Sequence, residues 1–240
     1  MIMSSWKKYF LVLLFTCLVS VTYGQPEHFT RDRSYDVLHY KLNITIDEKN
    51  KSCSGETSIR LVPLRPSMET LEIDAPESSV TSVRIGASQL RFEQRADSLE
   101  VFLNKSYSCS DTLTLTISYS VSSPQKGLYF VSPDSGYPDK HEQIWSQGAP
   151  EDNHWFPCYD SPNDRATSEM IVTVNEKFKA VSNGKLIEAK NNPSMHTTTY
   201  HWLEAKPHAS YLISLAVCDY VEVKDLYGNV PIINYVYPAQ

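Results

Sequence analysis

Hydrophobic and polar residues alternate along several stretches of this sequence, and this period of two constrains the fold more than any other feature. In residues 40–46, Tyr, Leu and Ile alternate with Lys, Asn and Thr, and residues 113–119 repeat the pattern with Leu, Ile and Tyr against Thr and Ser. Successive side chains of a β-strand point to opposite faces, so each stretch predicts a strand with one buried face. Residues 99–103 and 59–61 show shorter versions of the pattern.

Two apolar runs without alternation are also interpreted as strands. Ile171–Val174 predicts a strand buried on both faces, and the run Tyr211–Val217 predicts another that continues into Tyr220, Val221 and Val223. No stretch carries the i, i+3, i+4, i+7 apolar stripe of an amphipathic helix. Strands that follow strands favour antiparallel sheets in a sandwich or open barrel. Turn dipeptides are recognised at Ser54–Gly55, Asn183–Gly184, Asn192–Pro193 and Gly228–Asn229.

Residues 1–24 are predicted to be a signal peptide. Two lysines precede an apolar run from Tyr9 to Val21, and Thr22–Gly24 resembles a signal-peptidase site. The run is shorter than the roughly 18–20 residues that span a bilayer. Lipid anchoring through Cys17 is a poorer match, because Thr precedes it and apolar residues continue after it. We therefore expect an exported protein, periplasmic or secreted, without a membrane span, whose residues 25–240 form one β domain.

The charge balance narrows the classes of partner. The chain has 28 acidic and 22 basic side chains, for a net charge of −6, and removal of the predicted leader with its lysines makes it more negative. A nucleic-acid groove needs clustered Lys and Arg to displace phosphate counterions. An anionic membrane surface also attracts basic segments. Nucleic acid and anionic membranes are therefore excluded as expected partners.

Four cysteines follow the predicted leader. An even number in an oxidising compartment permits disulfides, and buried free thiols are the alternative that the sequence leaves open. No C-x-x-C spacing is present, which argues against a structural zinc site or a redox motif. The four are Cys53, Cys109, Cys158 and Cys218.

Residues 133–164 lack alternation and are rich in Pro, Gly, Asp, Asn and aromatic residues. A loop of this length inside a compact domain is usually either functional or wrongly assigned. The string from His141 to Trp145 has half of the H-E-x-x-H motif of zinc hydrolases, with Trp in place of the second histidine. Cys158 near His154 is interpreted as packing rather than as a thiol–imidazole pair. The sequence therefore predicts no metal site and no complete catalytic set. Strand-like surface positions are expected for His196, His201 and His208.

The same segment carries motifs of a known family. Residues 144–174 contain Ser-Gln, then F-P-C-Y-D-S-P, then A-T before an apolar strand. Y-D-V-L-H-Y at residues 35–40, A-V-S-N-G at residues 180–184 and Y-L-I-S-L-A-V-C-D-Y at residues 211–220 extend the similarity, with Cys218 where the family usually has Gly. Together these motifs resemble the N-terminal domain of the aminopeptidase N and leukotriene hydrolase family of zinc metallopeptidases, especially its bacterial branch.

The resemblance implies an all-β fold, a saddle-shaped, mostly antiparallel β-sandwich-like domain. In that family a catalytic domain follows with the motifs G-A-M-E-N and H-E-x-x-H, and this chain contains neither. We therefore predict the N-terminal domain of an exported zinc aminopeptidase, truncated and inactive alone. The resemblance assigns zinc and the peptide substrate to a missing or separate catalytic domain. The alternative is a stand-alone, non-catalytic β-sandwich that binds a peptide or a partner protein.

One substrate-binding residue follows from the resemblance. Gln147 matches the glutamine that faces the free amino terminus and first side chain of the peptide. The family often has Glu or Gln two residues later, where this chain has Ala149, or Gly148 by a second way of counting. The contact with the amine is therefore weakened, and Glu151 or Asp152 replaces it only if the loop is rebuilt. Packing is expected for Phe156, Cys158 and Tyr159, and a turn with local hydrogen bonds for residues 160–165.

Overall fold

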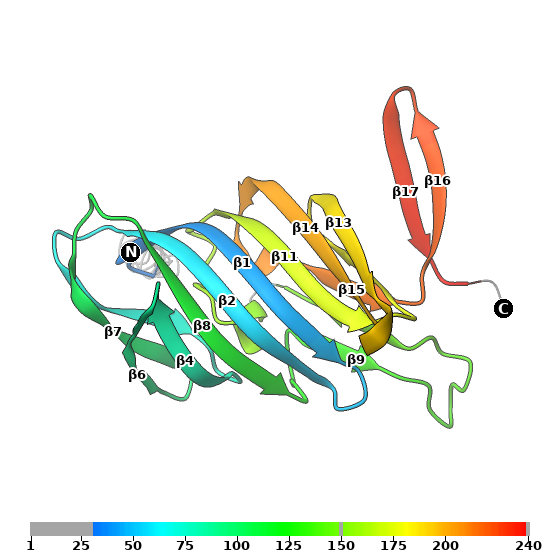
Figure 1. Cartoon of the computed structure of the whole chain (residues 1–240), viewed down its shortest axis with the longest axis horizontal. Coiled ribbons are helices and arrows are strands. Elements are labelled where there is room, and N and C mark those ends of the chain that lie inside the picture. The colour runs from blue at the N-terminus through cyan, green and yellow to red at the C-terminus, as the bar shows by residue number, and fades with distance from the viewer. Residues whose placement is uncertain (1–30, 149–150, 239–240) are drawn as a thin grey trace, which may run out of the picture. The chain divides into compact units, whose positions relative to one another are not determined.

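The computed structural model describes residues 31–148 and 151–238, so the predicted signal peptide and Ala149 lie outside the described residues. The alternating stretches of the sequence form one eight-stranded sheet in the order β13-β14-β11-β1-β2-β8-β4-β5 (Figure 1). Its neighbouring strands are antiparallel except for β1 and β11, which are parallel. The strands are β1 (Tyr35–Asp47), β2 (Ser52–Pro63), β4 (Ser79–Ile85), β5 (Ser88–Gln89), β8 (Leu113–Ser122), β11 (Ala166–Asn175), β13 (Lys185–Asn192) and β14 (Thr197–His208).

Three smaller sheets complete the described strands, in the orders β12-β15-β10-β9, β3-β7-β6 and β16-β17. Short 3-10 turns lie between some consecutive strands. No α-helix occurs in the part of the chain that the structure describes. The all-β, mostly antiparallel prediction is therefore confirmed. The elements are β3 (Met68–Asp74), β6 (Arg91–Gln94), β7 (Ser98–Tyr107), β9 (Leu128–Val131), β10 (Gln143–Ser146), β12 (Lys179–Ser182), β15 (Leu215–Cys218), β16 (Val221–Tyr227), β17 (Val230–Val236), and the 3-10 turns η1 (Asp152–His154), η2 (Pro193–Met195) and η3 (Ser210–Leu212).

The core forms where the inward faces of the sheets meet. Along β1, Leu42 and Ile44 are buried while Asn43 between them is exposed, as the alternation predicts. Ile73 of β3 and Leu215 of β15 belong to the same hydrophobic cluster as the β1 side chains. One core therefore joins the eight-stranded sheet to the two smaller sheets, within a compact unit that spans residues 33–240.

Burial along β11 differs from the prediction. Met170, Val172 and Val174 are buried, whereas Ile171 and Thr173 between them are only half-buried. The expectation of a strand buried on both faces is therefore wrong. The reason is that β11 presents one side to the core and its other side to the partly solvated face of the eight-stranded sheet.

The predicted single strand from Tyr211 to Val223 is also wrong. Residues 210–212 form η3, β15 begins at Leu215, and the next strand, β16, is exposed along its whole length. The side chain of Asn183 explains the break, because its Nδ2 donates to the Leu212 carbonyl oxygen (2.9 Å) and its Oδ1 accepts from the Ser214 N–H (2.6 Å). An apolar run in the sequence cannot show this contact with a distant turn.

The predicted turn at Ser54–Gly55 is wrong for a similar reason. Both residues lie inside β2, and Gly55 pairs with Ile44 of β1. A Cβ atom on Gly55, which has φ +151°, would approach the Asn43 carbonyl oxygen to 2.2 Å. The glycine therefore allows close contact between two strands rather than a turn. The other recognised turns fall at breaks between elements.

All four described cysteines carry free thiols. Cys53, Cys158 and Cys218 are buried, and Cys109 is exposed. Of the two alternatives that the sequence leaves open, the structure has the free thiols. Among the residues that the structure describes, no helix is long and apolar enough to cross a bilayer.

Candidate functional site

Gln147 is the first residue after β10 in the four-stranded sheet. Its backbone N–H donates to the carbonyl oxygen of Gly127 (2.9 Å), just before β9. The preceding residue, Ser146, accepts the Leu215 N–H on its Oγ (2.8 Å). The side chain of Gln147 is exposed. The backbone is thus held from both sides while the amide group faces solvent, where a ligand can reach its donor and its acceptor.

Gly148 brings the following loop against η3. A Cβ atom at this position would lie 1.6 Å from the carbonyl oxygen of Tyr211, so the packed backbone leaves no room for a side chain. By one of the two ways of counting, Gly148 occupies the place where the family has an acid or amide. The packing against Tyr211 gives a physical reason why that contact is missing at this position. Ala149, the position by the other count, lies outside the described residues.

Two aromatic rings lie beside this loop. Tyr129 of β9 and Trp145 of β10 are stacked, with ring centroids 4.7 Å apart and planes at 26°. The Tyr129 hydroxyl donates to Glu151 Oε2 (3.1 Å), and Lys126 Nζ lies 3.6 Å from Glu151 Oε1. Partial burial raises the pKa of Tyr129, and the hydrogen bond to Glu151 adds to the effect. These contacts hold the Glu151 carboxylate beside the strand pair that ends at Gln147.

Asp152 is fully buried, although it neighbours Glu151 in the sequence. The indole N–H of Trp155 donates to its Oδ1 (2.8 Å), while its Oδ2 is buried without a hydrogen-bond partner. Burial raises the pKa of Asp152 to about 7. A carboxyl group in this position cannot reach a substrate, so Asp152 does not replace the missing family acid. Glu151, which is half-buried, is the acid of the two that remains accessible.

The F-P-C-Y-D segment, residues 156–160, follows the Gln147 loop and packs in the core. Phe156 and Cys158 are completely buried, and Tyr159 is nearly so. Cys158 exchanges two backbone hydrogen bonds with Asp74 at the end of β3 (2.9 and 3.1 Å), and the Tyr159 N–H donates to the Tyr40 hydroxyl (3.0 Å). The predicted packing role of these three residues is confirmed. They tie the loop to both the eight-stranded and the three-stranded sheet.

Residues 160–165 were expected to make local hydrogen bonds, and this is wrong in part. Asp164 Oδ2 accepts from the backbone N–H of Val37 (3.0 Å), and its Oδ1 accepts from Arg33 Nη2 (2.8 Å). The Asp160 N–H donates to Asp74 Oδ2 (2.8 Å). The sequence pattern of a turn is correct, but the Asp164 carboxylate anchors the segment to β1, and the Asp160 N–H anchors it to the Asp74 carboxylate of β3.

The two histidines of this segment, His141 and His154, form separate contacts rather than a metal centre. His141 stacks on Tyr237 (4.8 Å between centroids, planes at 5°), and Trp145 lies in a strand rather than one helical turn away. His154 Nδ1 lies 2.9 Å from Glu77 Oε1, so His154 pairs with that acid rather than with Cys158. Across residues 31–148 and 151–238, no group of three or more His, Cys, Asp or Glu side chains is arranged to hold a metal ion. These residues do not fit a zinc site.

His201 and His208 lie on β14, as predicted, whereas His196 precedes that strand in a left-handed conformation, so the expectation of a strand position is wrong for His196. His201 Nε2 is 2.6 Å from Glu169 Oε1 of β11, and His208 Nε2 is 3.2 Å from Ser168 Oγ. His196 follows η2 in an exposed position.

The family model of the peptidase M1 N-terminal domain matches residues 36–212 of this chain. The chain belongs to the peptidase M1 N-terminal domain family. The match begins at the second residue of β1, includes the Gln147 loop and the buried F-P-C-Y-D segment, and ends at the last residue of η3. The recognition from sequence motifs is therefore confirmed at the level of the family.

Known proteins with different names are similar to this chain over most of its length. Transcription initiation factor TFIID subunit 2 of Gallus gallus is 23% identical over 83% of this chain and 21% of its own length. Leucine aminopeptidase 2 of Saccharomyces cerevisiae is 25% identical over 78% of this chain and 28% of its own length. An M1 zinc metallopeptidase variant from Deinococcus radiodurans, solved with a Tyr-Ser-Ala substrate, shares the fold at a TM-score of 0.70 and 21% identity, with coverage of 85% of this chain and 47% of that one. The chain thus spans less than half of each.

Sequence reasoning missed the contacts that Lys126, Gly127 and Tyr129 make with the loop. Gly127 has φ +74°, and a Cβ atom there would lie 2.2 Å from the Glu151 carbonyl oxygen. A glycine directly before an apolar strand is a signal that could have marked this close approach. Nothing in the local sequence connects Tyr129 with Glu151, because the contact depends on the pairing of β9 with β10.

Proposed function

We propose that this chain is the substrate-side N-terminal domain of an exported zinc aminopeptidase. The observation that carries the proposal is Gln147, which an M1 N-terminal domain presents at the end of β10 with its backbone fixed and its side chain exposed. The names of an aminopeptidase and of a zinc metallopeptidase among its relatives support the same activity. Because the described residues do not fit a zinc site, the proposal assigns the metal and peptide-bond cleavage to a catalytic domain.

The chemistry of the loop suits the amino terminus of a peptide. The Oε1 atom of Gln147 accepts a hydrogen bond from an ammonium group, and charge-assisted hydrogen bonds of this kind are about twice as strong as neutral ones. Glu151 adds a carboxylate next to β9, where Tyr129 and Lys126 contact it. The stacked pair of Tyr129 and Trp145 offers an apolar surface to the first side chain of the peptide. Contacts that require a free amino terminus select exopeptidase substrates.

The activity is tested on the protein that the source cells make. An antibody against this domain isolates it, and the isolate is assayed with aminoacyl anilides in the presence and absence of a zinc chelator. We expect chelator-sensitive hydrolysis in the isolate and none from the purified 240-residue chain, which lacks H-E-x-x-H. An isolate without such hydrolysis contradicts the proposed function, and zinc-dependent turnover by the purified chain contradicts its inactivity alone.

Export is part of the same proposal and has its own test. The lysine pair, the apolar run and the small residues before Gln25 support a cleaved signal peptide. Amino-terminal sequencing of the protein from the periplasmic or secreted fraction should begin at Gln25. A protein that retains residues 1–24 and stays in the cytoplasm contradicts export.

A second candidate function is a non-catalytic binding module. The observation in its favour is that TFIID subunit 2, whose name is that of a transcription factor subunit rather than a peptidase, aligns with 83% of this chain. Similarity to this chain is therefore not confined to proteins that are named as peptidases. If the antibody isolate contains this chain with a partner protein and no hydrolysis, the binding module is the better description.

A further inference from the structure

Buried oxygen atoms without a hydrogen-bond partner occur in and beside η1, the 3-10 turn that follows the Gln147 loop. In the described part of the chain, Asp152 Oδ2, Asn153 Oδ1 and Asp160 Oδ2 are buried and have no partner. Asp152 is 0% exposed, and the Trp155 indole N–H binds only its other carboxylate oxygen. A buried acceptor without a donor costs free energy, so three such atoms in one segment indicate that a further group binds there.

The two carboxyl groups of this set are close enough to affect each other. The Asn153 backbone N–H donates to the Asp160 carboxylate, which places Asp160 beside η1. Burial raises the pKa of Asp152 to about 7, and the negative charge of Asp160 adds to this effect. Burial is also the main reason why the pKa of Asp160 is raised. Both carboxylates are therefore costly to ionise unless a positive charge is bound beside them.

The segment before β4 is tied to η1 and contributes another unpaired oxygen. His154 Nδ1 lies 2.9 Å from Glu77 Oε1, and the Asp160 N–H donates to Asp74 Oδ2. Ser78, next to Glu77, is 6% exposed, and its Oγ has no hydrogen-bond partner among the residues that the structure describes. Within residues 74–78 and 152–160, the buried side-chain atoms that lack a partner are thus all oxygens.

Oxygen ligands of this kind suit a hard cation. Calcium prefers carboxylate, amide and other oxygen ligands and accepts irregular geometry with about six to eight of them. Magnesium demands a nearly octahedral shell and usually keeps several waters, and a fully buried carboxylate such as that of Asp152 leaves little access for them. Zinc is bound mostly by thiolate and imidazole groups. Among these ions, calcium fits the atoms best.

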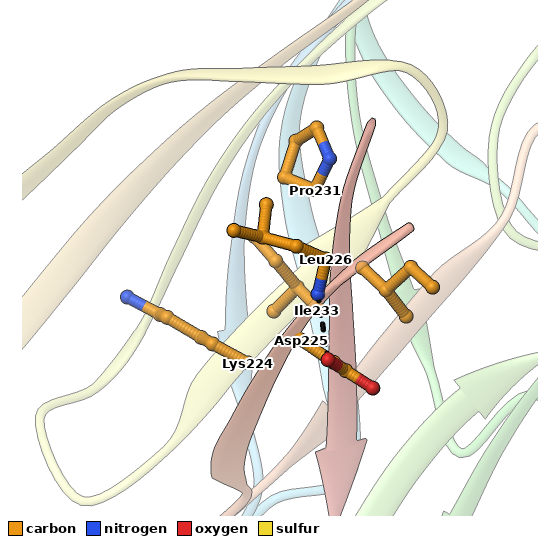
Figure 2. Close-up of a pocket in the computed structure, with 6 residues that line it drawn as sticks. Lys224, Asp225, Leu226, Pro231 and Ile233 are labelled. Atoms are coloured by element: carbon orange, nitrogen blue, oxygen red, sulfur yellow. Dashed lines mark hydrogen bonds between the residues drawn. The ribbon is translucent and has the colours of Figure 1, made fainter. Parts of the chain in front are cut away.

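The groove on the β16–β17 hairpin does not offer a comparable set of ligands (Figure 2). It is lined by Lys224, Asp225, Leu226, Pro231, Ile232 and Ile233. These residues lie on strands that are exposed along almost their whole length, and they supply one carboxylate next to an ammonium group. The oxygen atoms that suit a cation are therefore those in the interior, at η1.

We propose that Asp152, Asn153 and Asp160 bind one calcium ion, which joins η1 to the end of the F-P-C-Y-D segment. The two carboxylates balance the charge of the ion, and the Asn153 amide oxygen is a neutral ligand. The set has two carboxylates and an amide, so it differs from the groups of three His, Cys, Asp or Glu side chains that a zinc centre uses. Because η1 directly follows the Gln147 loop, the ion fixes the end of that loop. In the calcium-free protein, Asp152 binds a proton instead.

Calcium binding to the purified chain, after removal of metals with a chelator, tests the site. Equilibrium dialysis with radioactive calcium should give one ion per chain. The melting temperature should rise by at least about 5 °C at a calcium concentration about one hundred times the dissociation constant. Magnesium should bind at least about tenfold more weakly. No bound calcium, no rise in melting temperature, or equal binding of magnesium overturns the proposal.

Variants of the ligands separate this site from binding at the surface. Asp152→Asn and Asp160→Asn should each lower the calcium affinity at least about tenfold. In chelator their melting temperatures should match or exceed that of the wild type, because each variant removes a buried carboxyl group that is costly to ionise. Asp97→Asn, on an exposed turn, should bind calcium as the wild type does. Unchanged affinity in the two ligand variants would mean an adventitious ion only and overturns the proposal.

Two measurements on the unaltered chain do not depend on the folding of any variant. Asp152 must release its proton before it binds the ion, so the calcium affinity should fall about tenfold between pH 8 and pH 6. Terbium bound in place of calcium should luminesce when tryptophan is excited, because the Trp155 indole nitrogen is 2.8 Å from Asp152 Oδ1. Calcium should abolish this luminescence. An affinity that does not change with pH, or no luminescence that calcium displaces, overturns the proposal.

Discussion

Asp152 carries its carboxyl group in a fully buried position, where the Trp155 indole N–H is bound to one of its oxygens. Burial raises its pKa from 3.8 to about 7. The folded protein therefore holds this proton more tightly than the unfolded chain does. Its contribution to stability is fully present below the unfolded pKa and is lost as the pH rises from about 4 to about 7. Each pKa unit corresponds to about 1.4 kcal/mol, so the effect amounts to a few kcal/mol.

Asp152→Asn should remove this pH dependence. The amide keeps an oxygen that accepts from Trp155 and carries no charge at any pH, so we expect the variant to be more stable than the wild type at pH 7 and similar at pH 4. Chemical denaturation at a series of pH values measures both free energies of unfolding. Asp97→Asn, on an exposed turn, is the control and should follow the wild type. A variant less stable than the wild type at pH 7 contradicts the account.

The cysteines should differ in reactivity according to their burial. Burial raises the pKa of Cys53 and of Cys218 to about 12 and that of Cys158 well above its usual value, whereas Cys109 is exposed. Because the thiolate is the nucleophile, iodoacetamide at pH 8 should modify Cys109 in the native protein and all four in denaturant. Peptide mass mapping without a reductant shows which cysteines are alkylated and whether any two are joined by a disulfide. Any pair of these residues recovered as a disulfide would contradict the structure.

At the scale of elements, Gly148 determines how the substrate loop approaches η3. Gly148→Ala would place a methyl group 1.6 Å from the Tyr211 carbonyl oxygen, so the backbone must move. We expect a loss of about 1–3 kcal/mol, the usual range for an overpacked site. Gly136→Ala is the matched control, since its Cβ would meet Asp134 Oδ1 at 3.4 Å, near ordinary contact. Thermal unfolding gives the melting temperature of each variant, and that of Gly148→Ala should be the lower. Equal melting temperatures would show that the loop is not packed as described.

The hairpin should be the least protected pair of strands in the purified chain. Its side chains are exposed along both strands, whereas β1 and β2 are paired on both edges within the eight-stranded sheet. Local stability follows such burial, so amides of β16 and β17 should exchange with deuterium at least about tenfold faster than those of β1. Hydrogen-exchange mass spectrometry resolves these peptides. Protection of the hairpin equal to that of β1 would mean that it is already covered in the isolated chain.

Strands could be predicted where buried and exposed residues alternate. They were predicted less well where contacts between residues distant in the sequence determine where a strand ends. The period of two in residues 40–46 and 113–119 correctly assigned the apolar side chains to the buried face, although Thr116 on the other face is buried as well. The run after Tyr211 was misassigned, because Asn183 from another turn binds Leu212 and Ser214 and ends any strand there. Gly55 was mistaken for a turn because a close approach between β1 and β2 has the same local signature as a turn.

For the molecule as a whole, the spaced motifs were enough to recognise the family. For the candidate site they indicated some of the residues but not the contacts between them. Motif matching singled out Gln147 and correctly assigned Phe156, Cys158 and Tyr159 to packing. It could not show which of Glu151 and Asp152 is accessible to a substrate. That depends on which side chain is buried against Trp155, and the structure shows that it is Asp152. Nor could it find Tyr129, which reaches Glu151 through the pairing of β9 with β10.

In the proposed function, the side chain of Gln147 binds the amino terminus of the peptide substrate. The most direct test is to replace Gln147 in the protein made by the source cells. Gln147→Ala removes a hydrogen bond to a charged group, worth about 1.5–3 kcal/mol, so kcat/KM for aminoacyl anilides should fall by roughly ten- to a hundredfold. Gln89→Ala, on the exposed edge strand β5, should leave it unchanged. An unchanged kcat/KM in the Gln147 variant would contradict the account.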